Sequence, residues 1–102
     1  MWLFALFDVP VDSKAARRNY ARFRKALLKE GFTMLQYSVY ARYFPSEQAA
    51  APYKQRIRGK MPPQGQVRLL AVTERQFARQ EVFQSAKPRD PEAAEASQLM
   101  LF

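Results

Sequence analysis

The chain has 102 residues, of which 48% are hydrophobic and 25% charged, a composition typical of one folded domain rather than of a disordered segment. It contains no cysteine and no histidine, which excludes disulfides, thiolate or imidazole metal sites, and catalysis by Cys/His or Ser/His pairs. Its net charge of +8 favours a polyanionic partner, with nucleic acid before a membrane surface.

The first element is the apolar run 2–7, which is followed by Asp8 and Pro10 and predicts a central strand buried on both faces. The run is too short for a membrane span and has no basic flank, so we expect a cytoplasmic protein without a membrane partner. Asp8 lies where this strand ends. Its carboxylate is placed either to bind a cation or to cap backbone amides of the turn, and both alternatives stay open.

A helix is expected from a cap at Asp12 or Ser13 to a stop at Gly31. Apolar side chains at spacings of three and four form its inward stripe: Ala16, Tyr20, Phe23 and Leu27. Basic side chains follow its outer face: Lys14, Arg18, Arg22, Lys25 and Lys29. The helix is therefore amphipathic and basic.

The segment 32–44 is aromatic and β-branched but too long for one strand, so two strands with a turn or bulge near 36–38 are expected. Ser46 then caps a second helix, which ends before Gly59 and carries the inward stripe Ala49, Tyr53 and Ile57. The segment 67–73 is the fourth strand, and 81–85 a short fifth. The tail changes from a polar linker to the apolar Leu99–Phe102, which predicts a flexible arm with a docking end.

This βαββαβ order predicts an α+β, ferredoxin-like sandwich over residues 1–80, followed by a short strand and a C-terminal arm over 81–102. Both helices would cover one sheet face. The first strand offers Leu3, Ala5 and Phe7 to one side, while the segment 2–6 also places apolar side chains on the other. A homodimer that packs sheet on sheet would bury this second face.

Acidic residues near Asp8 are scarce, since Asp12 is better placed as a helix cap. Two-metal phosphodiester hydrolysis needs several converging carboxylates, which this chain lacks. In a dimer, two Asp8 side chains could share one Mg²⁺, with Arg17 or Arg18 stabilising the developing charge. Weak nuclease activity is expected at most.

Basic residues on the two helices are the predicted phosphate contacts: Arg17, Arg18, Arg22, Lys54, Arg56 and Arg58. The alternative is that they form ordinary solvated helix faces, but few acidic residues are present to neutralise them. No glycine-rich phosphate loop or base-reading motif occurs, so binding should depend on the nucleic-acid backbone and not on its sequence.

The order Phe7-Asp8-Val9, Lys14, Arg17-Arg18, Gly31 and the string 35–40 resembles a small CRISPR-associated adaptation protein family. Members of this family are often described as endoribonucleases, and they partner the CRISPR integrase. The resemblance spans roughly residues 1–80, and the segment 32–40 is most similar to members from type II systems.

The resemblance implies a ferredoxin-like homodimer with Mg²⁺ shared between the paired Asp8 carboxylates, and cleavage of RNA or DNA in some members. In spacer acquisition, such a dimer bridges two integrase dimers and contacts phosphates of the prespacer duplex. Four residues match family positions associated with nucleic-acid handling: Phe7, Arg17, Arg18 and Tyr40. Thr33 and Ala41 replace the basic and acidic residues of many members, which weakens the expectation of nuclease activity.

Three hypotheses follow. The favoured one is a non-catalytic scaffold on duplex DNA. The alternative is a genuine metal-dependent endoribonuclease or endodeoxyribonuclease that uses the paired Asp8 site, with single-stranded RNA as a possible substrate. A small-molecule regulatory domain could share the fold, but the positive charge argues against it.

Overall fold

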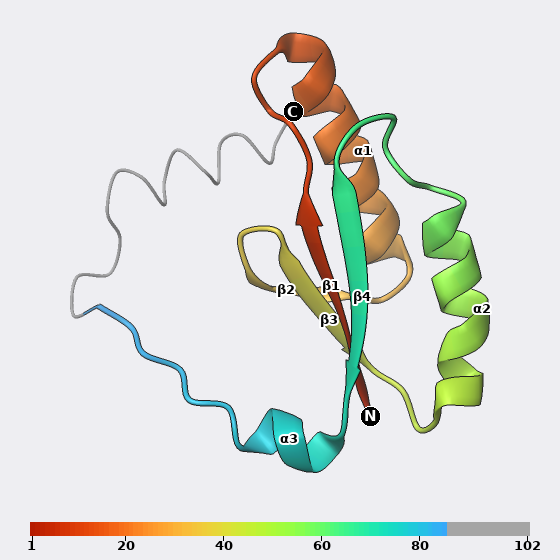
Figure 1. The fold of residues 1–102 in the computed structure, drawn as a ribbon, viewed down its shortest axis with the longest axis vertical. Helices are drawn as coiled ribbons and strands as arrows, with labels where there is room; N and C mark the ends of the chain where they lie inside the picture. Colours follow the sequence, from red (N-terminus) through yellow and green to blue (C-terminus); the bar gives the residue numbers. More distant parts are fainter. Residues whose placement is uncertain (86–102) are drawn as a thin grey trace.

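The computed structural model describes residues 1–85, which form four strands and three helices. In chain order these are β1 (Trp2–Asp8), α1 (Lys14–Lys29), β2 (Thr33–Gln36), β3 (Val39–Tyr43), α2 (Glu47–Arg58), β4 (Gln66–Val72) and α3 (Glu74–Ala78) (Figure 1). The sheet order is β2-β3-β1-β4, with every neighbouring pair antiparallel. This order confirms the ferredoxin-like prediction.

Side-chain caps and a glycine set the helix ends. Ser13, and not Asp12, caps α1 by accepting a hydrogen bond from the Ala16 amide at 3.0 Å. Gly31 follows the helix with a φ of +84°, a conformation that favours glycine. Ser46 caps α2 in the same way as Ser13 caps α1, so the predicted helix boundaries are confirmed.

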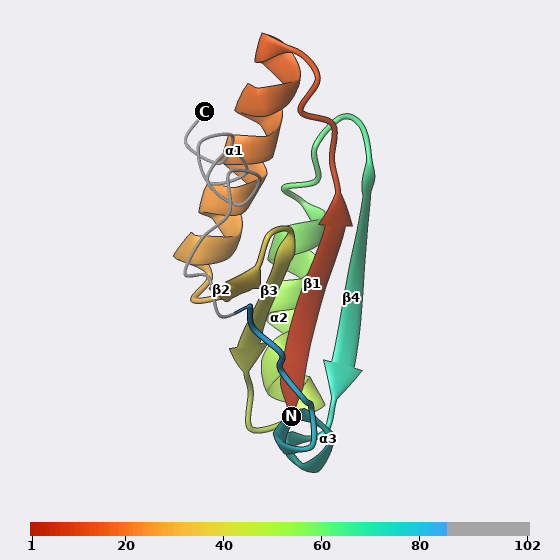
Figure 2. The same ribbon diagram turned by 90° about the vertical axis from the view of Figure 1, so that its left-hand side faces the viewer.

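The hydrophobic core lies between one face of the sheet and the helices α1 and α2. Leu3, Ala5 and Phe7 of β1 are buried on this face, as the alternation of the strand predicts. The inward stripes of the two helices complete the core with Tyr20, Phe23, Leu27, Ala50 and Ile57. Figure 2 shows α2 behind the strands when the sheet is seen from its other side.

That other side, the open face, is only partly covered within one chain, so burial of β1 on its second face by a homodimer stays a prediction. Cross-strand neighbours align in rows on this face: Tyr43, Trp2 and Val72 in one, and Val39, Leu6 and Arg68 in another. Trp2, Phe4 and Leu6 are each partly exposed.

A short helix covers one end of the open face. Thr73 and Gln76 form a capping box that starts α3 directly after β4. Phe77 of this helix stacks on Trp2, with 4.1 Å between ring centroids and 12° between ring planes. The ring centroid of Phe77 also lies 5.8 Å from the ring centroid of Phe4. The sequence analysis did not predict α3, which lies at the end of the sheet where β1 begins (Figure 1).

The short strand predicted over 81–85 is not formed within the described residues. A strand needs the backbone of a neighbour, and residues 81–85 pair with no strand of the sheet β2-β3-β1-β4. The predicted arm with its apolar end Leu99–Phe102 lies outside the described residues. None of the helices in residues 1–85 has the length and apolar character needed to cross a membrane.

Candidate nucleic-acid and metal sites

Asp8 is the last residue of β1 and pairs with Gln66 at the start of β4. Gly65 fixes this end of the strand because its φ is +103° and its Cα lies against the backbone of Asp8 and Val9. A Cβ at residue 65 would overlap the Asp8 carbonyl oxygen. Only glycine therefore allows residue 65 to lie this close to the backbone of Asp8.

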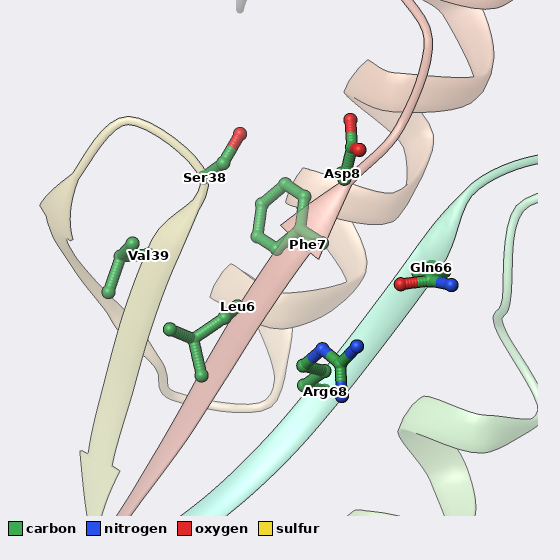
Figure 3. A pocket seen from close by; sticks show the side chains of 7 residues that line it. All are labelled: Leu6, Phe7, Asp8, Ser38, Val39, Gln66 and Arg68. Atoms are coloured by element: carbon green, nitrogen blue, oxygen red, sulfur yellow. The ribbon is translucent and has the colours of Figure 1, made fainter.

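Asp8 lines a shallow hollow on the open face (Figure 3), where β1 ends, at the end of the sheet away from α3 (Figure 1). The lining residues come from β1, β4 and the β2–β3 turn with the start of β3: Leu6, Phe7, Asp8, Ser38, Val39, Gln66 and Arg68. Figure 3 shows Asp8 and Ser38 pointing to the same side, beyond the ends of their strands. A carboxylate, a hydroxyl, an amide and a guanidinium thus share one hollow.

The Asp8 carboxylate is exposed and forms no hydrogen bond or ion pair within residues 1–85. It does not cap backbone amides there, so the capping alternative is not supported. Its neighbours Ser38 and Gln66 offer further oxygen donors, the ligand type that Mg²⁺ prefers. The described part of one chain contains no group of three acidic, histidine or cysteine ligands. These donors suit a hydrated Mg²⁺, and a second carboxylate would have to come from another copy.

Ser38 is held in an unusual backbone conformation beside this hollow. Its φ is +63°, a region that non-glycine residues seldom adopt. Its hydroxyl shares a 3.0 Å hydrogen bond with the Tyr20 hydroxyl, and its carbonyl accepts a 3.1 Å hydrogen bond from the Phe7 amide. Burial raises the pKa of the Tyr20 hydroxyl well above its ordinary value. Tyr20 thus stays protonated and ties the β2–β3 turn to α1.

Two residues associated with nucleic-acid handling by resemblance are core residues. The side chain of Tyr40 is 0% exposed, and its hydroxyl has no hydrogen-bond partner in the described part of the chain. Phe7 is 6% exposed and packs edge-on against Phe23, with 5.1 Å between ring centroids. A direct contact between nucleic acid and Tyr40 is incompatible with this burial, so that prediction is corrected to a packing role.

Basic side chains gather around a groove between α1 and α2, which we call the helical groove. Its lining consists of Arg22, Lys25, Ala26, Lys29, Gly59, Lys60 and Met61. This lining includes no acidic residue. Because α1 and α2 cover the sheet face opposite the hollow, the helical groove and the Asp8 hollow are separate sites. The structure therefore brings Arg22, Lys25 and Lys29 of α1 together with Lys60, which follows the end of α2.

Arg56 has an acidic partner, unlike the residues of the helical groove. Its Nε donates hydrogen bonds of 2.9 Å to both carboxylate oxygens of Glu30, which raises the pKa of the guanidinium. The same guanidinium lies over the Tyr53 ring at 4.4 Å from its centroid. Arg42 donates a 2.6 Å hydrogen bond to the Glu30 carbonyl and lies 4.2 Å from the Tyr53 centroid. Arg56 therefore ties α2 to the end of α1.

The other predicted phosphate contacts are dispersed over the helices. Arg17 is partly buried and donates a 3.3 Å hydrogen bond to the Val11 carbonyl. Arg18 and Arg58 are exposed, and Lys54 is partly exposed. None of these four lines the helical groove or the Asp8 hollow. The predicted role of Arg17 or Arg18 in stabilising charge at Asp8 stays a prediction.

Ser38, Gln66 and Arg68 are the polar residues of the hollow that the sequence analysis missed. Arg68 interrupts an apolar strand segment, which is the signal that could have singled it out. Ser38 lies in the predicted turn, but its contact with Tyr20 depends on the packing of α1.

Comparisons of the sequence with a family model and with individual proteins identify the same family. The family model described as CRISPR associated protein Cas2 matches residues 1–80. A protein from Parvibaculum lavamentivorans is 48% identical over 102 residues, covering all of both chains. One from Acidovorax ebreus is 40% identical, also over all of both chains. One from Lacticaseibacillus rhamnosus is 51% identical over 77 residues, or 76% of each chain. All three relatives carry the name CRISPR-associated endoribonuclease Cas2.

Proposed function

Because this chain belongs to the CRISPR associated protein Cas2 family, we propose that it serves as a homodimeric scaffold for spacer acquisition in the cytoplasm. In this role it binds the phosphates of duplex DNA and bridges two integrase dimers. The observation that carries the proposal is the helical groove, in which Arg22, Lys25, Lys29 and Lys60 converge. Converging cations that form no ion pair within the groove lining attract a polyanion of any base sequence.

The open face supports the dimer in this proposal. Leu70 is 53% exposed and Tyr43 43% exposed on a face that also carries Trp2 and Phe4. Packing two such faces together would remove this apolar surface from water, at roughly 25 cal/mol for each Å². The helical layers of both copies would then face outward. A dimer of this kind would present two helical grooves to DNA.

Charge reversal in the helical groove tests the proposal. The double variant Lys25→Glu/Lys29→Glu should weaken duplex DNA binding at all sequences and reduce the slope of log K against log[salt] by about 2. The matched control is Lys14→Glu/Arg75→Glu, which changes the net charge equally at exposed positions outside the groove. Fluorescence anisotropy at several salt concentrations gives both quantities, and circular dichroism checks folding.

The control should lose only the modest affinity that follows from lower net charge. Equal losses in the groove variant and the control would mean that no particular surface binds DNA, and would refute the role of the groove. Arg18→Glu, on the exposed first half of α1, tests whether DNA also reaches that end of the helix.

A second candidate function, metal-dependent endonuclease activity on RNA or DNA, is favoured by the unpaired Asp8 carboxylate and by the name of the relatives. Asp8 of each copy would hold a shared Mg²⁺. The side chains of Ser38 and Gln66 line the same hollow. When bound, this ion supplies positive charge that stabilises the phosphate during cleavage.

Asp8→Ala separates the two functions. If the chain is a nuclease, purified Asp8→Ala protein should lose cleavage of single-stranded RNA and duplex DNA, whereas Asp12→Ala should keep it. Retained cleavage by Asp8→Ala would reject the catalytic candidate. The scaffold proposal instead expects folded Asp8→Ala protein to bind the integrase and to support spacer integration. Loss of integration with intact integrase binding would reject it.

A further inference from the structure

The helical groove combines exposed cations with an apolar floor. Its four basic side chains are all exposed, and the thioether of Met61 in the same lining is 42% exposed. Ala26 and the aliphatic stems of the lysines add further apolar surface. The groove has a volume of about 390 Å³, within the range of binding sites. Phosphates would use only its charged part, so the groove also fits an occupant that carries both acidic and apolar side chains.

The cations of the groove have no carboxylate partner within residues 1–85. The one ion pair in this part of the chain joins Arg56 to Glu30, and both residues line an adjoining hollow that shares Lys29 and Lys60 with the groove. The Glu30 carboxylate is thus already bonded to Arg56. A carboxylate that neutralises the groove must therefore come from outside the described residues.

The chain itself contains a segment of this chemistry, which lies outside the described residues. Residues 90–102, which we call the acidic segment, include Asp90, Glu92 and Glu95 and no basic residue. Four consecutive apolar residues follow in the same segment, Leu99–Phe102. Its charge is opposite to that of the groove, and its apolar residues match the groove floor.

The tether is long enough for this contact. Leu99 lies 14 residues beyond residue 85, a length that spans up to roughly 46 Å when extended. The longest principal extent of the fold is 37 Å. A tethered segment also has an effective concentration on the order of mM, so that weak contacts suffice to hold it.

We propose that the acidic segment binds in the helical groove, with its carboxylates at the cations and its apolar residues at Met61. The inference deepens the scaffold proposal and rests on it for one consequence. Because the segment occupies the surface that binds duplex DNA, it competes with the phosphates, and a duplex of high charge density displaces it.

Paramagnetic relaxation enhancement in the full chain tests where the segment binds. Since the chain has no cysteine, Ser97→Cys provides a single attachment site for a nitroxide. Methionine methyl groups labelled with carbon-13 report on the groove through Met61. In the absence of DNA, the Met61 signal should lose most of its intensity relative to the same sample after reduction with ascorbate. Equal intensities before and after reduction would overturn the proposal.

Two charge variants and one apolar variant complete this test. Lys25→Glu/Lys29→Glu should restore the Met61 signal, whereas the control Lys14→Glu/Arg75→Glu should leave it weak. Restoration in both variants would show that net charge alone attracts the segment, which contradicts a contact with the groove. Broadening that is unchanged in Leu101→Ser/Phe102→Ser would overturn the apolar contact.

The competition with DNA has a separate readout, measured by fluorescence anisotropy. Neutralising the segment should strengthen binding of duplex DNA several-fold, in the variant Asp90→Asn/Glu92→Gln/Glu95→Gln. The control raises the net charge equally at exposed positions outside the groove, in the variant Asp12→Asn/Glu74→Gln/Glu81→Gln. Equal gains in both variants would overturn the competition. Because the Met61 experiment contains no DNA, its result does not depend on whether the groove is the DNA-binding surface.

Discussion

The two ends of the open face are built by the same strands, β1 and β4, but they differ in chemistry. At one end Trp2 pairs with Tyr43 and Val72, and Phe77 of α3 stacks on its ring. At the other end lie the polar groups of the hollow, without a covering helix in the described chain. On the open face itself, aromatic stacking lies at the Trp2 end, away from the hollow. At the polar end the exposed groups lie over core residues of the other face, such as Phe7, which packs against Phe23.

Gly65→Ala should have the largest effect on stability. It disturbs the close contact of Gly65, just before β4, with the end of β1 beside the hollow. The Cβ would meet the Asp8 carbonyl oxygen, and φ is +103°. We expect a loss of roughly 2–4 kcal/mol in the free energy of unfolding. Urea denaturation measures this value. Gly59→Ala is the control, since its Cβ would lie at ordinary contact distances of 3.5 and 3.6 Å from backbone oxygens. Equal losses in both variants would show that the contact with Asp8 is unimportant.

Phe77→Ala disturbs the end of the open face at which Phe77 stacks on Trp2. Loss of the stacked ring should cost about 1–2 kcal/mol and expose Trp2 to water. Since Trp2 is the single tryptophan of the chain, its fluorescence should shift to longer wavelength. Phe83→Ala removes a ring that is 86% exposed and should leave the emission unchanged. An unchanged spectrum in Phe77→Ala would show that α3 does not cover this end.

Tyr20→Phe removes the hydrogen bond to Ser38 and should cost about 1 kcal/mol at neutral pH. Burial raises the pKa of Tyr20 in the folded state, so the unfolded chain releases this proton first. The free energy of unfolding should therefore fall as pH rises above about 10, where unfolded tyrosine ionises. Urea denaturation between pH 8.5 and about 11 should show a shallower fall in Tyr20→Phe. Tyr43→Phe is the control, and an identical slope in both variants would contradict the role of burial.

Asp8→Asn should have the smallest effect on stability. The carboxylate is exposed and has no hydrogen bond within the described residues, so the change should stay within about 0.5 kcal/mol. Thermal unfolding measures it at neutral pH. A clear loss of stability would assign Asp8 to the support of the fold, and a clear gain would point to repulsion between carboxylates in a dimer.

The sequence predicted most of the fold because periodicity and local chemistry determine it. The alternation in β1 and the stripe Tyr20, Phe23, Leu27 depend only on neighbouring residues, and both are confirmed. Ser13 and Ser46 cap their helices by local hydrogen bonds. The helix α3 was missed although Thr73 and Gln76 form a capping box, a local signal, because the strand predicted over 67–73 includes Thr73. The contact that packs α3, between Phe77 and Trp2, joins distant parts of the chain.

The candidate site was harder to predict than the fold. Asp8 could be singled out because a carboxylate after an apolar strand is visible in the sequence. The place of Arg68 beside it depends on the register between β1 and β4, which no local pattern gives. Tyr40 was assigned to nucleic-acid contact by resemblance. The pairing of β3 with β1 instead directs its side chain to the core face of the sheet.

The pairing of β1 with β4 also has a consequence for biosynthesis. Trp2 of β1 pairs with Val72 of β4, so β1 gains this neighbour only after the intervening chain has been made. At typical rates of translation the delay is on the order of 3–14 s. During this time one edge of an apolar strand has unsatisfied backbone groups, which favours aggregation or capture by chaperones. Translation speed should therefore affect the yield of folded protein more strongly between β3 and β4 than after them.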